Sequence, residues 1–237
     1  MGAAPHRRGS TVIPRTLRPL AAEFVGTALF VFLGAGSVVM NAHTAGALGA
    51  TGIALAHGVG LAIAVSMTMN ISGGHLNPAV TAGLWVADKV DGRTALSYVG
   101  AQLVGALVGA ALVKGLLPLA AVRVTLAGAP KLADTVTFMQ GIWIEALLTF
   151  FLVSAVFGTA VSPEAPKIGG FGIGLAVFVD ALVGGGLTGA AMNPARAFGP
   201  AIISADVHGQ AVWWIGPLLG AAAAGWLWRT VLLPKQR

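Results

Sequence analysis

The residues best placed to do chemistry in this sequence form one short motif that occurs twice: Asn77, Pro78, Ala79 and Asn193, Pro194, Ala195. Asparagine caps a helix N-terminus through its side-chain oxygen, and proline suits the first helical position. Each motif therefore predicts the start of a helix, with the side-chain amide still free to donate hydrogen bonds. One copy would be an ordinary helix start, but two copies in matched surroundings indicate a shared role.

The composition places these motifs in a membrane. Of the 237 residues, 56% are hydrophobic and 9% are charged, whereas a soluble domain carries about 25% charged residues. So little charge could not cover a surface in water, and most of the surface must therefore face lipid. The 34 glycines suit the close helix contacts of membrane bundles. The sequence has no cysteine, which excludes disulfides and a thiolate metal site.

Six apolar runs reach the roughly 20 residues that a spanning helix needs. They predict an all-α integral membrane protein with six transmembrane helices. The runs are Leu20–Met40, Leu48–Met69, Ala95–Leu117, Val136–Thr159, Ile168–Gly185 and Gln210–Leu233. The runs that begin at the two motifs, Asn77–Val86 and Asn193–Ser204, are too short to span and predict two re-entrant half-helices.

The sequence contains an internal repeat. Residues 71–79 match residues 187–195 at an offset of 116, and the same offset aligns 100–106 with 216–222. Each half carries three spans and one half-helix, and an odd number of spans makes the second half an inverted repeat of the first. We expect a cytoplasmic N-terminal tail over 1–18, a channel domain over 19–233 and a cytoplasmic C-terminal tail over 234–237. The two repeats of the channel domain cover about 19–117 and 136–233.

The basic residues predict the orientation, because cytoplasmic loops carry an excess of Lys and Arg. With both termini cytoplasmic, ten basic residues lie inside: Arg7, Arg8, Arg15, Arg18, Lys89, Arg93, Lys167, Arg229, Lys235 and Arg237. Four lie outside: Lys114, Arg123, Lys131 and Arg196. We expect a multi-pass protein of the plasma (inner) membrane, without a cleaved signal peptide.

The glycine-rich turns before the motifs are expected to line a pore. Irregular backbone at membrane depth is tolerated where it lines an aqueous cavity or is buried in protein. Candidate pore carbonyls are those of Gly73, Gly74, His75, Gly189 and Ala191. The two half-helices should meet at their N-termini near the bilayer midplane, where two positive dipole ends repel cations.

At this point a family resemblance is plain. Residues 72–81 and 192–201 resemble the two signature loops of the aquaporin, or major intrinsic protein, family, and the likeness extends from about Leu20 to Leu233. The resemblance implies a passive water channel that assembles as a homotetramer. It also implies an outer selectivity filter of His57, Ala181, Ala190 and Arg196, and an apolar wall opposite the asparagines, formed by Phe30, Leu61, Leu152 and Val177.

The filter departs from that of strict water channels, which usually have phenylalanine in place of His57 and histidine in place of Ala181. A histidine at 57 is similar to plant vacuolar aquaporins. Two alanines predict an opening wide enough for ammonia, hydrogen peroxide or glycerol beside water, selected by hydrogen bonds to His57 and Arg196. Ala197 and the pair Trp213-Trp214 instead resemble water-type members. A glycerol or small-solute facilitator is the alternative.

Three acidic residues fall inside apolar spans, where such residues are costly and usually partnered or functional. Glu23 and Glu145 occupy similar places in the two halves, which favours loop bracing over a proton relay: each would accept hydrogen bonds from backbone N–H groups of its re-entrant turn. The resemblance implies the same role. Asp180 has no counterpart in the first half and could act as a local acceptor or in solute selection.

Two other function classes fit poorly. A secondary transporter shares inverted repeats but needs ion ligands or a coupling acid near the midplane. An enzyme needs a nucleophile–base set or metal ligands, and the five histidines show no metal-ligand spacing. We therefore expect no catalytic residues, metal or cofactor. The expected partners are water, small neutral solutes, lipid and further copies of the chain, and not nucleic acid.

Overall fold

The computed structural model describes residues 17–234, all of whose regular structure is helical. The helices are α1 Leu17–His43, α2 Gly49–Ser72, α3 Pro78–Val86, α4 Gly92–Leu116, α5 Leu119–Val124, α6 Phe138–Val156, α7 Phe171–Thr188, α8 Pro194–Ser204 and α9 Val212–Leu227. Three shorter turns are η1 Leu126–Gly128, η2 Phe157–Val161 and η3 Trp228–Leu232. The predicted all-α class is confirmed. Most of both predicted tails, with Arg7, Arg8, Arg15, Lys235 and Arg237, lies outside the described residues.

Five helices, α1, α2, α4, α6 (with η2) and α7, are long and apolar enough to cross a bilayer. The sixth predicted span is divided: α9 has 16 residues, and the chain continues directly into the five-residue π turn η3. At about 1.5 Å per residue the two together reach roughly 30 Å, the thickness of a hydrocarbon core. The sixth span therefore reaches the required length only with its π turn.

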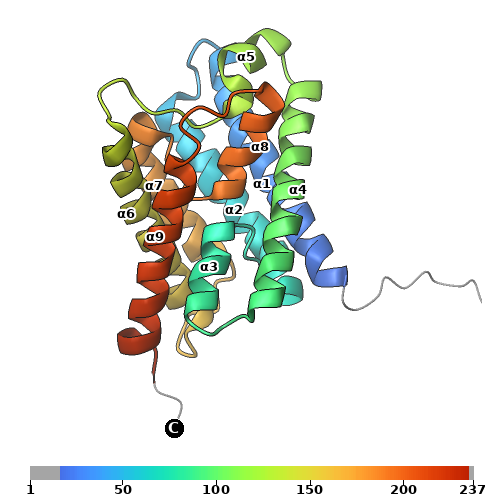
Figure 1. Ribbon diagram of the computed structural model, residues 1–237. Helices are drawn as coiled ribbons and strands as arrows, with labels where there is room; N and C mark the ends of the chain where they lie inside the picture. Colours follow the sequence, from blue (N-terminus) through green and yellow to red (C-terminus); the bar gives the residue numbers. More distant parts are fainter. Residues whose placement is uncertain (1–16, 235–237) are drawn as a thin grey trace, which may run out of the picture.

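The bundle has two ends, which Figure 1 shows at the bottom and the top. Helix α1 begins and η3 ends at one end, called here the termini face; α5 covers the other, called here the α5 face. The half-helix α3 lies in the half of the bundle next to the termini face, and α8 lies in the half next to the α5 face. Both begin near the centre, so that their N-termini point at each other. The helix α5 and the turn η1 were not predicted.

The inverted repeat is visible in the packing. Helix α1 packs on α4 in the first half as α6 packs on α9 in the second, and α2 meets α7 between the halves. Each half-helix packs against the last long helix of the other half: α8 on α4 and α3 on α9. Glycine makes this closeness possible, because a Cβ at Gly109 of α4 would collide with the carbonyl oxygen of Ala28 on α1.

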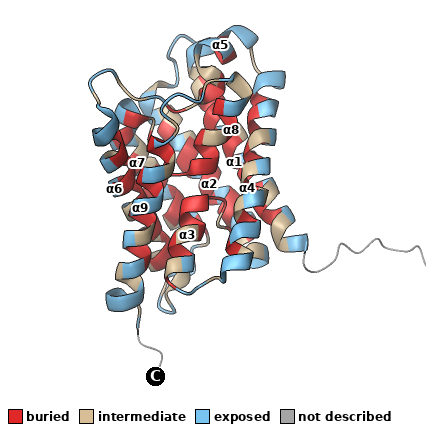
Figure 2. Cartoon of the chain, viewed as in Figure 1, coloured by how far each residue is buried: buried red, intermediate tan, exposed pale blue. Residues whose placement is uncertain are grey.

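Figure 2 shows buried residues on the inner faces of the helices and exposed residues on the perimeter; the buried set includes polar and charged side chains, and the exposed set includes many large apolar ones. Glu23, Glu145, Gln102 and Thr188 are fully buried, whereas Leu96, Leu147 and Val183 are each about 70% exposed. A perimeter of leucine and valine is stable against acyl chains. The interior is therefore where polar groups meet.

Candidate functional site

The two asparagines lie where the half-helices meet, and each caps its own helix. The Oδ1 atom of Asn77 accepts from the backbone N–H of Ala79 at 2.8 Å. The Oδ1 atom of Asn193 accepts from Ala195 N at 3.0 Å and Arg196 N at 3.2 Å. Proline follows each asparagine at the first helical position, as the sequence predicts. The cap fixes each amide at the end of a helix dipole.

The same amides tie the two halves together. Asn77 Nδ2 donates to the carbonyl of Met192 at 2.9 Å, and Asn193 Nδ2 donates to the carbonyl of Leu76, also at 2.9 Å. Leu76 and Met192 have positive φ angles of 51° and 50°, which turn these carbonyls toward the opposite asparagine. A left-handed non-glycine residue costs roughly 1–2 kcal/mol. Each amide has a second N–H that these bonds leave available.

In the first half, Glu23 of α1 holds the turn before α3. Its Oε1 accepts from Ser72 Oγ at 2.6 Å and His75 N at 3.0 Å, and its Oε2 accepts from Leu76 N and Gln102 Nε2, both at 2.7 Å. All four donors are satisfied by one buried carboxylate. The carboxylate thereby supplies acceptors for backbone N–H groups that no helix pairs, which lipid could not do.

In the second half, Glu145 of α6 holds the turn before α8 in the same way. It accepts from Thr188 Oγ1 at 2.6 Å, Ala191 N at 2.9 Å and Met192 N at 2.7 Å. Trp213 Nε1 adds a bond to the carbonyl of Thr188 at 2.9 Å. The geometry fits an acceptor that orders a turn, and every contact of Glu145 is used for that purpose.

The first half has a polar network that sequence reasoning missed. Thr81 Oγ1 donates to the carbonyl of Asn77 at 3.0 Å, so the same oxygen accepts from Gln102 Nε2 at 3.0 Å and His75 Nδ1 at 3.1 Å. Tyr98 contacts the edge of His75. Gln102 lies in the repeated segment 100–106, and a glutamine inside an apolar span was the available signal.

On the α5 side of the asparagines, the four predicted filter residues line one cavity of about 420 Å³: His57, Ala181, Ala190 and Arg196. The segment Ala129–Lys131 forms its outer rim. Arg196 is 2% exposed, and its Nη1 donates to the carbonyl of Gly128 at 3.0 Å. That carbonyl was not predicted, since a backbone acceptor in an irregular connection leaves no sequence signal.

The imidazole of His57 orients Arg196. His57 Nδ1 lies 2.9 Å from the carbonyl of Ile53, which can only accept, so Nδ1 carries the proton. His57 Nε2 then accepts from Arg196 Nη2 at 3.1 Å. Both ring nitrogens are thus engaged. The expected direct bond from His57 to a solute finds no free nitrogen in this arrangement, and the donors facing the cavity belong to Arg196.

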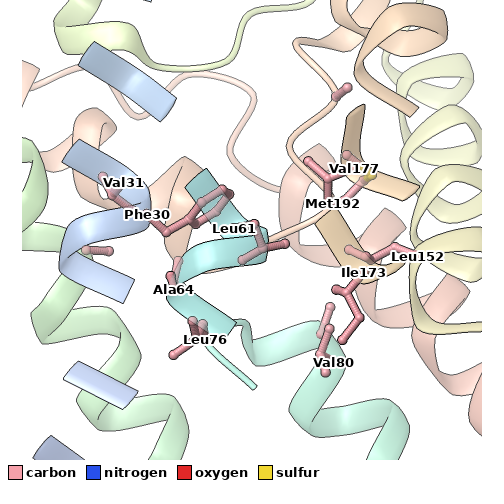
Figure 3. Packing of buried hydrophobic residues seen from close by; sticks show 14 of the residues in the cluster. Phe30, Val31, Leu61, Ala64, Leu76, Val80, Leu152, Ile173, Val177 and Met192 are labelled. Carbon is pink, nitrogen blue, oxygen red and sulfur yellow. The ribbon is translucent and has the colours of Figure 1, made fainter. Parts of the chain in front are cut away.

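On the other side, the termini face has a cavity of about 330 Å³ lined by Gly73, Gly74 and His75 with Val80 and Ile173. Gly189 belongs to the α5-face cavity, whereas Ala191 is buried and lines neither of these two cavities. The four residues of the predicted apolar wall belong to one buried hydrophobic cluster. Figure 3 shows Phe30 and Leu61 facing Leu152 and Val177 across the centre; all four are buried.

Asp180 stands apart from this arrangement. It lies on α7 and is 6% exposed, and its Oδ2 has no hydrogen-bond donor among the residues the structure describes. The expected local acceptor role therefore has no donor at Oδ2. The described residues contain no group of three or more histidine, aspartate or glutamate side chains placed to hold a metal ion.

Two half-helices whose N-termini point at each other, with a cavity at each face of the bundle, are the arrangement expected of a membrane channel. Residues 11–228 match the model of the Major intrinsic protein family, and the chain belongs to that family. As a member of this family of passive channels, it is a multi-pass integral membrane protein and not an enzyme.

Curated relatives cover most of the chain. It is 38% identical over 226 residues to "Probable aquaporin TIP2-2" of Oryza sativa subsp. japonica, spanning 92% of this chain and 88% of that protein. It is 40% identical over 219 residues to "Aquaporin TIP4-4" of Zea mays, spanning 88% and 84%. Among solved structures, the aquaglyceroporin from Plasmodium falciparum matches with a TM-score of 0.78 and 26% identity, covering 91% of this chain and 96% of that one.

Proposed function

We propose that this chain conducts water in single file between the two cavities, down the osmotic gradient. The observation that carries the proposal is the pair of asparagines that cap the two half-helices where their N-termini point at each other. Water would accept from the free N–H of Asn77 and Asn193 and donate to carbonyls of the re-entrant turns. Because the remaining wall is apolar, binding is weak enough for release. The aquaporin names of the relatives support water as the permeant.

Protons and cations would be excluded at two levels. Two positive dipole ends converge at Asn77 and Asn193, and a cation there would be both desolvated and repelled. Arg196 adds a fixed positive charge on the α5 side, and the residues lining that cavity include no carboxylate. We place the selectivity filter at His57, Ala181, Ala190 and Arg196, with Arg196 as its donor and His57 as the group that orients it.

The experiment is stopped-flow swelling of proteoliposomes with equal amounts of folded protein. Replacing Asn77 and Asn193 together by alanine should cut osmotic permeability at least tenfold, because both donors and both caps are lost. Asn70→Ala is the matched control, since Asn70 is an exposed asparagine near the end of α2. Unchanged permeability in a correctly folded double variant would contradict the assignment.

Small neutral solutes form a second candidate set. Ala181 and Ala190 contribute only methyl groups to the α5-face cavity, and the structural match to an aquaglyceroporin is compatible with glycerol. The same vesicles should therefore be challenged with glycerol, urea, ammonia and hydrogen peroxide. Channel-dependent uptake of any of them sharpens the proposal, and rejection of all four would limit it to water.

We also propose cytoplasmic termini, a homotetramer and a plasma-membrane location. The helices and connections that reach the termini face contain Arg18, Lys89, Arg93, Lys167 and Arg229, and those on the α5 side contain Lys114, Arg123, Lys131 and Arg196. This excess supports cytoplasmic termini. Protease accessibility of a C-terminal tag tests orientation, crosslinking in native membranes tests the tetramer, and membrane fractionation tests the location.

A further inference from the structure

Each half-helix ends against a basic side chain from the other half. Lys114, in the last turn of α4, donates from Nζ to the carbonyl of Ile203 near the end of α8, at 3.1 Å. Arg229, in η3 after α9, donates from Nη1 to the carbonyl of Val86 at the end of α3, at 3.2 Å. The offset of 116 maps residue 114 onto 230, next to Arg229. Both cations thus stabilise the negative end of a half-helix dipole.

The two copies differ in what accompanies the cation. On the termini face, Arg229 also forms an ion pair with Asp88, which follows α3. The offset maps Asp88 onto Ser204 at the end of α8. The hydroxyl of Ser204 donates to the carbonyl of Pro200 at 2.8 Å and carries no charge. At the α5 face, the end of the half-helix therefore has a basic side chain, Lys114, but no acidic side chain at the position that corresponds to Asp88.

A second cavity of about 420 Å³ lies beside Lys114 and Ser204, separate from the α5-face cavity that Arg196 lines. It is lined by two basic side chains and otherwise by apolar residues and Ser204: Lys114, Arg123, Leu119, Val122, Leu126, Ala127, Ile203 and Ser204. Across residues 17–234, neither Lys114 nor Arg123 forms an ion pair with a carboxylate. Lys114 uses one N–H for Ile203, which leaves its other N–H groups available.

The surroundings of this cavity are those of a membrane boundary. It opens where the spanning helix α4 ends and the short helix α5 begins. Leu119, which lines the cavity, is 48% exposed, and Leu116 and Val124, which are close to lining residues in the sequence, are 69% and 77% exposed. Exposed apolar side chains beside two cations match the two parts of a phospholipid, acyl chain and phosphate. A free anion would gain nothing from the apolar part.

We propose that this cavity binds the phosphate of an anionic phospholipid, with Lys114 and Arg123 as its ligands. The phosphate takes the place that the Asp88 carboxylate occupies in the inverted copy. Charge-assisted hydrogen bonds from both side chains hold it, and Leu119 and Val124 contact the acyl chains. Bound lipid joins α4, α5 and the end of α8, and so stabilises the fold on the α5 face. This site is independent of the permeant solute.

The test uses the full chain purified in detergent and supplied with phosphatidylglycerol, phosphatidylcholine or inorganic phosphate. Native mass spectrometry counts retained lipid, and thermal unfolding measures its stabilising effect. Phosphatidylglycerol should be retained and should raise Tm, because a ligand that binds the folded state stabilises it. Equal retention of phosphatidylcholine would overturn the requirement for an anionic headgroup. Equal stabilisation by inorganic phosphate would overturn the assignment to a lipid.

Variants then locate the site. Arg123→Gln should weaken phosphatidylglycerol binding about tenfold, as expected for one charged contact. Ser204→Asp, which supplies the carboxylate of the other copy, should raise Tm in the absence of lipid and lower lipid retention. Lys131→Gln removes one positive charge from the same face but outside this cavity, and should retain lipid as the unmodified chain does. Unchanged binding in both Arg123→Gln and Ser204→Asp would refute the site.

Discussion

The cavities at the two faces share positions of the repeat, yet only the α5-face cavity has a buried charged side chain in its lining. Arg196 and His57 line the cavity of the α5 face. The offset of 116 relates Arg196 to Val80 and His57 to Ile173, and both of these line the cavity of the termini face. At these positions one end of the pore therefore has a buried guanidinium and an imidazole, and the other end has two aliphatic side chains.

The difference separates two tasks. The elements that hold the backbone are repeated: each half has its asparagine cap, its bracing glutamate and its positive-φ turn. The elements placed to select among solutes occur once. A single selective ring suffices, because any solute that crosses the membrane must pass it whichever way it travels. The repeated parts should thus govern folding, and the unique parts should govern selectivity.

The largest effect is expected from the repeated parts. Glu23→Ala and Glu145→Ala should each destabilise the fold by roughly 2–6 kcal/mol, since at least two buried backbone N–H groups lose their acceptor at about 1–3 kcal/mol each. Glu23→Ala should be the worse, because Glu23 serves four donors and Glu145 serves three. Thermal unfolding and yield in detergent measure both. Glu164→Ala, in an exposed loop, is the control. If either Glu23→Ala or Glu145→Ala is as stable as the unmodified chain, that glutamate does not brace its re-entrant turn.

The second-largest effect is expected when the positive charge of Arg196 is removed. Arg196→Val gives the α5 face the residue that the termini face has at Val80, and should produce a proton or cation leak about tenfold above that of protein-free vesicles while water still passes. A pH-sensitive dye inside the vesicles reports proton entry under an imposed gradient. The unmodified channel should show no leak. A variant as tight as the unmodified channel would place all exclusion at the midplane and remove Arg196 from the barrier.

A smaller, more selective change tests the width of the ring. His57→Phe with Ala181→His should rebuild the filter typical of strict water channels, because both alterations add bulk beside Arg196. Water permeability should stay within about twofold, and uptake of the largest solute that the unmodified channel passes should fall at least tenfold. Swelling rates with paired water and solute gradients measure both. If the unmodified channel already rejects every solute but water, the wide ring is wrong.

The smallest effect is expected in the unmodified chain treated with mercurials, which should leave water permeability unchanged because the sequence has no cysteine. Ala190→Cys places a thiol in the α5-face cavity and should confer a block that added thiol reverses. Thr44→Cys, in an exposed turn after α1, should confer none. Inhibition of the unmodified protein would mean that another group is the target.

Much of this organisation could be predicted from the sequence because it rests on local chemistry. The starts of α3 and α8 follow from asparagine and proline alone. The span ends were less well predicted: α1 ends at His43 rather than Met40, since a helix continues past its apolar run into the interface. The acceptor at Gly128 and the hydrogen bond from Arg196 to His57 depend on how distant segments meet, which no local pattern records.

The exchange of hydrogen bonds between the halves has a consequence for how the protein is made. Leu76 receives its donor from Asn193, and Met192 receives its donor from Asn77. When the ribosome has completed the first half, the carbonyl of Leu76 still lacks its hydrogen-bond donor, Asn193, which lies more than a hundred positions downstream. The first re-entrant turn therefore cannot reach its final form during its own insertion. Maturation of the pore is a late event, reached when the second half enters the membrane and closes both turns at once.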